Sequence, residues 1–435
     1  MQTEVDLVVG DARDSCATNG VAQRHLLTLC PAMVPGKCVS HLLMGTGQHV
    51  MAPQLGPFMA DMLTLSSHSL AFKTAFKDAF GLAMKTYSKV RWWSRWELIE
   101  QLGTNFSCIG KLLNLLVQRG IGDSTTKGLI DIYNNHRFAL RCEIAMMLDL
   151  RPLVQATYLL EGDGLEGLLL VDKLEALRSL GRDIERGEPV LKNLAAVVRA
   201  KIDLAVGTEI NEYFGMPYNK YFKGKITKVG TGDPTLYTIR YEDGTTLNAE
   251  DHELRPWLPV ASKPEYIKYS RYALGAFSYL ERRITNDCAE PYHFKDNYRT
   301  WELARFFNPA WAAEHLNGCM VDSLIDLASI RHHALLEELR AEAHDYLTAC
   351  VGVSIDESDI HIFTDNVLAW WRANGQKFPT WAKAARMVFA LTPNSASAER
   401  VFSMLKHMFG DTQGGALGDY VEAALMLKYN QRKVG

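Results

Sequence analysis

Apolar positions repeat at intervals of three and four residues over most of this chain. The repeat runs through residues 60–200 and resumes from residue 263 to the end, with polar residues at the positions between. This period places apolar side chains on one face of an α-helix. The sequence therefore predicts a mainly helical protein. The tryptophan-dense stretch "KVRWWSRW" is the exception, because it fits either a strand or the start of a helix.

A different pattern interrupts the helices at residues 206–258. Glycines are closely spaced there, and runs such as "YTIRY" at 237–241 alternate between two faces. The pair Asp243 and Gly244 between two alternating runs is a strong signal for a β-hairpin. We expect a small, strongly bent β-barrel inserted between helical regions.

The amino-terminal residues predict a strand followed by a helix. A β-branched run at residues 5–9 is typical of a buried strand, and Gly10 is expected to end it in a loop. Asp14 lies just past this strand, where open α/β sheets gather their chemistry. From the residues alone, Asp14 is either a functional carboxylate or a cap for the helix that follows.

Proline and glycine divide the last residues of the chain into helices. Pro379 suits a first helical turn, and Pro393 is expected to end that helix. Ser395 is placed to cap a second helix that ends at Gly410, and Leu425 lies in a third.

The second of these helices begins with an adjacent acid and base. At 100° per residue, Ala398, Phe402 and Leu405 form one apolar stripe. Glu399 lies at the edge of the stripe and Arg400 lies nearly opposite it. Glu399 is therefore expected beside the packed face, where it also favours the positive end of the helix dipole.

Composition limits the class of protein. A chain of 435 residues with 47% hydrophobic residues is long enough for several cores. Its formal charge of -3 neither favours nor excludes a protein that binds nucleic acid. The eight cysteines form no CxxC pair, which suits reduced thiols. Without a signal-peptide or membrane-helix pattern, we expect a soluble nuclear or cytoplasmic protein that is not secreted.

The segment "FPTWAKAARMVFALTPNSASAERVFSML" and the later "YVEAALMLKYNQ" resemble the C-terminal dimerisation region of hAT-superfamily transposases. That signature has a proline, small residues, Glu-Arg, an aromatic residue and Ser. The matching positions here are Pro393, Ser395, Ala396, Ser397, Glu399, Arg400, Phe402, Ser403 and Asn430. The resemblance implies a homodimer or higher oligomer. The residues expected to support it are Trp381, Ala398, Arg400, Phe402, Leu405 and Leu425.

Weaker matches follow in the family's order along the chain. "DSCATNGVAQRHL" is similar to the family's second acidic block, with Asp14 at the catalytic position. "CVSH" matches its CxxH element through Cys38 and His41, and "KVRWWSRWE" resembles its Arg-Trp-x-Ser block. "QATYLLEGDG" resembles part of the family's helical insertion.

The resemblance implies a specific fold and chemistry. In that family an RNase H-like core holds two divalent metal ions on two aspartates and one glutamate, and a helical domain interrupts the core before the glutamate. We therefore expect a mainly α chain with a truncated RNase H-like α/β core and a large helical insertion that contains the barrel. Asp14 and Glu399 would meet because the insertion loops out and returns. Mg²⁺ or Mn²⁺ would be the metal of a competent site.

The chain departs from the family at the first catalytic aspartate. Neither Asp6 nor Asp11 occupies that position, and the amino-terminal zinc finger common in the family is missing. We therefore expect a catalytically inactive relative without a cofactor, which acts through dimerisation and associates with DNA or chromatin. The alternative is a fragment of an active DDE-type transposase that performs metal-dependent strand transfer.

The barrel segment resembles Tudor-like and other SH3-like barrels of chromatin proteins, through Gly207, Phe214, Gly224 and "YTIRYEDG". Such barrels bind methylated lysine when several aromatic rings enclose the cation. The candidate cage residues are Tyr213, Phe214, Tyr221, Phe222 and Tyr241, with Asp243 as an acidic wall. A methylated histone tail is then a candidate partner. The alternative is that these rings fill the core of a small barrel.

Two further motifs each have two interpretations. Cys38 and His41 offer two metal ligands, but a zinc site needs three or four, so packing is the alternative. Arg91, Trp92 and Arg95 interleave cations and aromatics as a single-strand nucleic-acid platform does. The alternative is that the tryptophans, Trp93 and Trp96 among them, anchor the core.

These patterns together predict five regions. They are a partial RNase H-like core at 1–100, a helical insertion at 101–205, the barrel at 206–258, the continued helical insertion at 259–375 and the dimerisation region at 376–435.

Overall fold

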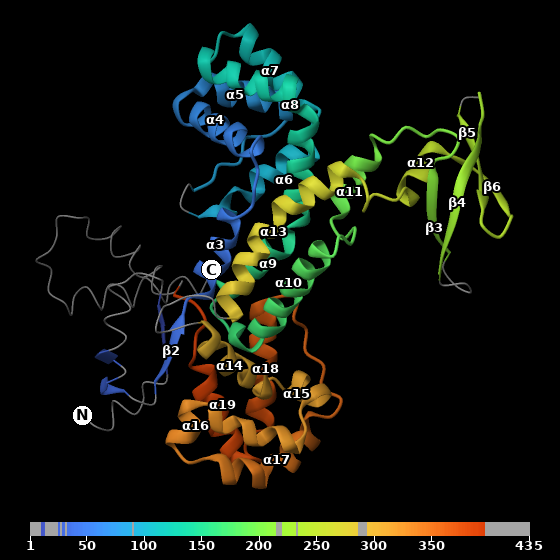
Figure 1. The fold of residues 1–435 in the computed structure, drawn as a ribbon. Coiled ribbons are helices and arrows are strands. Elements are labelled where there is room, and N and C mark those ends of the chain that lie inside the picture. Colours follow the sequence, from blue (N-terminus) through green and yellow to red (C-terminus); the bar gives the residue numbers. More distant parts are fainter. Residues whose placement is uncertain are drawn as a thin grey trace, which may run out of the picture. The chain divides into compact units, whose positions relative to one another are not determined.

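The computed structural model describes residues 10–13, 25–26, 28–30, 33–88, 91–214, 220–231, 234–285 and 294–395 (Figure 1). The chain divides into two compact units, each built from separate segments. Unit 1 comprises Met1–Met44, Gln155–Ala176 and Leu280–Gly435, and unit 2 comprises Gly45–Val154 and Leu177–Tyr279. Helices account for most of the described residues, which confirms the predicted mainly helical fold.

The elements of unit 2 are helices and one sheet. They are α4 (Leu55–His68), α5 (Leu70–Phe80), the 3₁₀ helix η1 (Trp92–Arg95), α6 (Trp96–Thr104), α7 (Cys108–Gln118), α8 (Asp123–Asp149), α11 (Lys192–Arg199), β3 (Glu209–Phe214), β4 (Lys220–Val229), β5 (Leu236–Tyr241), β6 (Thr246–Glu250), α12 (Asp251–Leu254) and η3 (Arg255–Trp257).

The elements of unit 1 come from three segments of the chain. They are β1 (Gly10–Arg13), β2 (Val34–Lys37), η2 (Glu166–Leu168), α14 (Phe294–Ala304), η4 (Arg305–Phe307), α15 (Pro309–His315), η5 (Gly318–Asp326), α16 (Ala328–His332), α17 (Leu336–Cys350), α18 (Ile360–Asn374) and α19 (Pro379–Phe389). Four helices have residues in both units: α3 (Val39–Gln48), α9 (Arg151–Leu160), α10 (Leu170–Glu185) and α13 (Pro264–Thr285).

Carboxylates of α8 hold the first turns of two other helices in unit 2. Glu143 is buried, and its Oε2 accepts hydrogen bonds from the backbone N of Gln54 and Leu55, where α4 begins. Asp149 accepts in the same way from Asn193 and Leu194 at the start of α11. The first N–H groups of a helix have no partner within the helix, so these acids satisfy them and favour the positive end of the dipole.

The inserted β segment forms a four-stranded antiparallel sheet in the order β3–β4–β5–β6. Every second residue of β5, namely Tyr237, Ile239 and Tyr241, is buried, as the alternating pattern predicted. The hairpin at Asp243 and Gly244 is also confirmed. Gly244 has φ +85°, the left-handed conformation that glycine adopts without strain. In the described ladders β3 and β6 are the edge strands, so closure into a barrel stays a prediction.

An aromatic core stabilises the part of unit 1 that precedes residue 390. The ring of Tyr346 stacks on Trp381 with centroids 4.1 Å apart and on Trp371 with centroids 5.5 Å apart. Both indole N–H groups donate to backbone carbonyls, Trp381 to Leu339 and Trp371 to Phe307. A buried indole N–H group needs such an acceptor. The two tryptophans therefore pack against Tyr346 and leave neither N–H group without a hydrogen bond.

The amino-terminal strand differs from its prediction. Sequence alone ended it at Gly10, whereas Gly10–Arg13 form β1 and pair in parallel with Val34–Lys37. The expected run at 5–9 lies outside the described residues. Pairing with a partner strand overrides the local tendency of glycine to end a strand.

Candidate functional site

The carboxyl ends of β1 and β2 lie side by side at one edge of a two-stranded parallel sheet, because Arg13 pairs with Lys37. Residues that follow parallel strands gather at such an edge, where α/β sheets place their chemistry. Cys38 is the first residue after β2. Asp14 follows β1 but lies outside the described residues, as does Glu399, so their meeting at a metal site stays a prediction.

Cys38 and Val39 connect this edge to residues near the end of the described chain. The Sγ atom of Cys38 accepts a hydrogen bond from the backbone N of Ser395, with 3.2 Å between the two atoms. The backbone N of Val39 donates to the carbonyl of Pro393 at 2.8 Å. This second bond satisfies an N–H group at the start of α3 that has no partner within the helix. Segments about 350 residues apart are therefore in direct contact.

Cys38 also interacts with His41, one turn along α3. The Cys38 side chain is buried and His41 is exposed. Burial raises the pKa of the thiol, but hydrogen bonds with His41 and Ser395 outweigh this effect and lower the pKa below its ordinary value. Within the described part of the chain, no three His, Cys, Asp or Glu side chains are grouped to hold a metal ion. A metal site here would need ligands from other residues.

Asn394 is the centre of a second set of contacts in unit 1. Its side chain is 2% exposed. The Nδ2 atom donates to the carbonyl of Leu160 at 2.8 Å and to Oε1 of Glu166 at 2.9 Å. Oε2 of Glu166 accepts from the backbone N of Gly164 at 2.8 Å. The amide thus ties the segment before residue 396 to the turn after α9. We call these contacts of Asn394 and Glu166 the Asn394 clasp.

Glu166 is an acid in an apolar environment. Burial raises the pKa of its carboxyl to about 7, although the hydrogen bonds from Gly164 and Asn394 favour the ionised form. The residue is 2% exposed, and near neutral pH its carboxyl is balanced between the two forms. Its main structural role is to accept hydrogen bonds on both oxygens.

Sequence reasoning missed both residues of the Asn394 clasp. Glu166 is a single acid in the apolar run "LEGLLLV", and a lone charge inside such a run is a signal that could have identified it. Asn394 lies between two residues of the resemblance, Pro393 and Ser395, but an asparagine after a proline also fits an ordinary turn.

The predicted dimerisation residues fall into two groups. Trp381 is fully buried in the aromatic core, so it stabilises α19 from within. The start of α19 at Pro379 is as predicted, and Glu342 caps it by accepting from the backbone N of Thr380 and Trp381. The other group lies outside the described residues: Ala398, Arg400, Phe402, Leu405 and Leu425.

The candidate cage residues are only partly described. Tyr241 is 6% exposed and belongs to the core of the sheet, and Phe222 packs against that core. Asp243 is exposed and accepts hydrogen bonds from Thr245 within the hairpin. The side chains of Tyr213, Phe214 and Tyr221 lie outside the described set, so a methyl-lysine cage stays a prediction.

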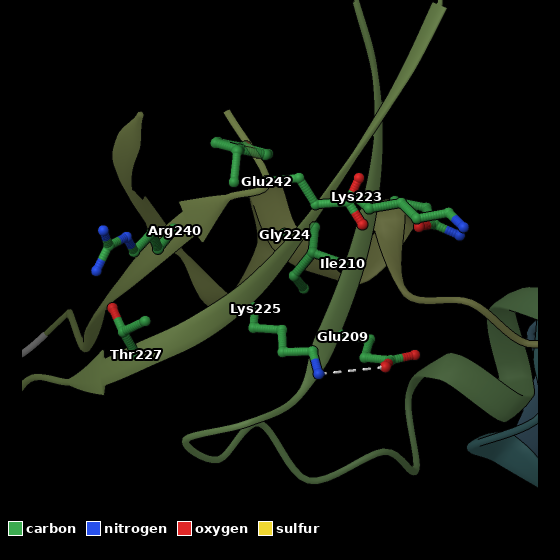
Figure 2. Close-up of a pocket in the computed structure, with 10 residues that line it drawn as sticks. Glu209, Ile210, Lys223, Gly224, Lys225, Thr227, Arg240 and Glu242 are labelled. Atoms are coloured by element: carbon green, nitrogen blue, oxygen red, sulfur yellow. Dashed lines mark ion pairs between the residues drawn. The ribbon is translucent and has the colours of Figure 1, made fainter. Parts of the chain in front are cut away.

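The sheet carries a groove of about 540 Å³ (Figure 2). Most of its lining is charged or polar: Glu209, Asn211, Lys223, Lys225, Thr227, Arg240 and Glu242, beside Ile210, Gly224 and Tyr241. Lys225 pairs with Glu209 at 3.7 Å, the dashed contact in Figure 2. The lining suits a charged ligand more than an apolar one.

The tryptophan-rich block is mainly a core element. Residues 92–95 form η1 and lead into α6, so the helix-start interpretation is confirmed. Trp93 is fully buried and Trp96 is 7% exposed, as core anchors are. Trp92 is half-buried, and the guanidinium of Arg95 lies 4.5 Å from its ring centroid.

No helix in the described ranges combines the length and the apolar character that a membrane crossing requires.

Comparison with known proteins identified one family. Residues 342–430 match the model of the hAT family C-terminal dimerisation region. A search of curated proteins found no match. The matched region begins at Glu342, the residue of α17 that caps α19. It includes α18, α19 and the segment from Pro393 to Ser395.

Proposed function

Because this chain is an hAT transposase-like protein with the family's dimerisation region at residues 342–430, we propose that it acts by associating with copies of itself. The family match carries this proposal. The proposal concerns self-association, and light scattering determines the number of subunits.

The architecture of unit 1 supports this proposal. The aromatic core around Tyr346 and Trp381 makes the first half of the matched region a rigid base. The Asn394 clasp and the Cys38 contact then fix the backbone immediately before residue 396. A self-association segment that starts from a fixed point loses less conformational freedom on binding than one on a free tether.

Light scattering after size-exclusion chromatography tests the proposal. The full chain is compared with a variant that ends at Ser395, which keeps Trp381 and Asn394. We expect a dimer or higher oligomer for the full chain and a monomer for the shortened one. A monomeric full chain, or the same oligomer in both, contradicts the proposal. A cut before Pro379 is unsuitable, because it would remove Trp381 from the core.

We propose further that the chain does not catalyse DNA strand transfer by itself. Asp11, the nearest acid before Asp14, lies in β1 only three residues before it, whereas the family pattern has further core strands between the first aspartate and the second acidic block. In the alternative, Asp14 and Glu399 would hold Mg²⁺ or Mn²⁺, which would supply Lewis-acid activation for phosphodiester transfer. A nicking assay with either metal decides between them. Turnover that Asp14→Ala abolishes would establish the alternative.

A further inference from the structure

Three lysines line up on the solvent face of β4. Lys223 and Lys225 are exposed, and the buried positions Gly224 and Ile226 alternate with them. Continued alternation would turn Lys228 toward the core. The register shift between Ile226 and Lys228 prevents this.

The β-bulge brings the third lysine to the same face. Beyond it, Lys228 pairs with Thr238 and Val229 pairs with the buried Tyr237. Val229 therefore takes the core side and Lys228 is exposed. A bulge of this kind re-aims side chains by adding one residue to a strand. The three lysines then span roughly 15 Å, at about 3.3 Å per residue.

A fourth cation faces them from the next strand. Arg240 of β5 is the direct cross-strand partner of Lys225 and is exposed. Like charges in directly opposite positions destabilise a sheet by a few tenths to about 1 kcal/mol. In Figure 2 the Arg240 side chain extends away from the pair formed by Lys225 and Glu209.

Acidic partners are few on this surface. In the part of the sheet that the structure describes, Glu209 is the one carboxylate that forms an ion pair with these cations, at 3.7 Å from Lys225. Among the described residues, no carboxylate lies within 4.0 Å of the charged nitrogens of Lys223, Lys228 or Arg240. Glu242 also lines the groove, and its backbone N donates to the carbonyl of Lys223 at 3.0 Å, so a second carboxylate lies beside this row of cations. The surface therefore keeps an excess of positive charge, although the whole chain is slightly acidic.

We propose that this face of β4 and β5 binds the phosphate backbone of a nucleic acid strand through Lys223, Lys225, Lys228 and Arg240. Phosphates of one strand recur about every 3.4 Å along the helix axis, which is close enough for each lysine of the row to contact one of them. Backbone contacts require cations and polar donors and need no apolar pocket, which matches the groove. The proposal concerns a surface outside the matched dimerisation region and is independent of self-association.

Fluorescence anisotropy with labelled 20-nucleotide single strands and duplexes tests it, on the full chain across a range of salt concentrations. The test variant is K223Q/K225Q/K228Q. Two controls accompany it: K223R/K225R/K228R keeps the charge, and K73Q/K77Q/K111Q removes three exposed lysines elsewhere in unit 2. Light scattering on each sample reports self-association separately.

We expect the glutamine variant to lose about two to three units of the slope of log K against log salt, and at least tenfold in affinity at low salt. Both controls should bind like the natural chain, and R240Q should lower the slope by about one unit. Equal slopes for the natural chain and the glutamine variant would overturn the proposal, as would no salt-dependent binding at all. If polyglutamate competes as well as nucleic acid does, the surface binds acidic peptides and the proposal fails.

Discussion

Asn394→Ala tests whether the Asn394 clasp holds unit 1 together. The substitution removes one amide and leaves two acceptors without their donor, the carbonyl of Leu160 and Oε1 of Glu166. Leu160 and Glu166 are 0% and 2% exposed, so water does not replace the amide easily.

The expected cost follows from these two acceptors. An unsatisfied buried acceptor costs about 1–3 kcal/mol. Two such groups, partly relieved by local relaxation, give about 3 kcal/mol for the opening of this part of unit 1. At about 1.4 kcal/mol per factor of ten, amides that exchange through this opening should exchange on the order of 100-fold faster.

Hydrogen exchange with mass spectrometry measures this directly. The informative peptide covers Gly164 and Leu165, whose N–H groups donate to Glu166 and to Oγ1 of Thr364. Asn374→Ala is the matched control, because Asn374 is half-buried and its amide Nδ2 donates to a single carbonyl, that of Trp370. The reasoning is refuted if exchange in Asn394→Ala rises less than tenfold, or if the control has the same effect.

Three further predictions concern stability. Burial raises the pKa of Glu166 from 4.5 to about 7. Between these two pH values the folded state holds a proton that the unfolded state has released. The free energy of unfolding should therefore fall by up to about 3 kcal/mol as the pH rises from 4.5 to 7. Urea unfolding at pH 5 and 7.5 should show a smaller difference for Glu166→Gln than for the natural chain, and an unchanged difference contradicts the assignment. Gly275→Ala should cost at least about 2 kcal/mol in urea unfolding, because its Cβ would lie 2.1 Å from the carbonyl oxygen of His49. The control is Gly56→Ala in α4, whose Cβ would meet no atom within 4 Å, and it should be neutral or stabilising by up to about 1 kcal/mol. Equal effects of the two substitutions would rule out the clash. Glu342→Ala removes the cap of α19 and should cost about 1–2 kcal/mol with a lower Tm, whereas an unchanged Tm would mean that water replaces the cap.

Local signals predicted much of this fold. Pro379 predicted the first turn of α19, and the pair Asp243 and Gly244 predicted its hairpin, because each depends on backbone preferences of the residues themselves. The buried stripe of β5 followed from alternation in the same way. Such features need no knowledge of a distant partner.

Features that depend on distant partners could not be predicted. The strand at Gly10–Arg13 exists because Val34–Lys37 pairs with it, and a glycine gave the opposite local signal. The partnership of Glu166 and Asn394 joins residues 228 positions apart, and nothing in either local sequence specifies the other. The exposure of Lys228 depends on a bulge that simple alternation cannot show.

The contact between Cys38 and Ser395 has a consequence for synthesis of the chain. Unit 2 lies entirely between Gly45 and Tyr279, so all of its own residues have been made when the ribosome reaches residue 280. Unit 1 is different, because the backbone N of Val39 receives its acceptor only with Pro393. Domains generally fold as units during translation. The start of α3 therefore lacks this acceptor until residue 393 has been made, and this interval is when a chaperone would matter most to this chain.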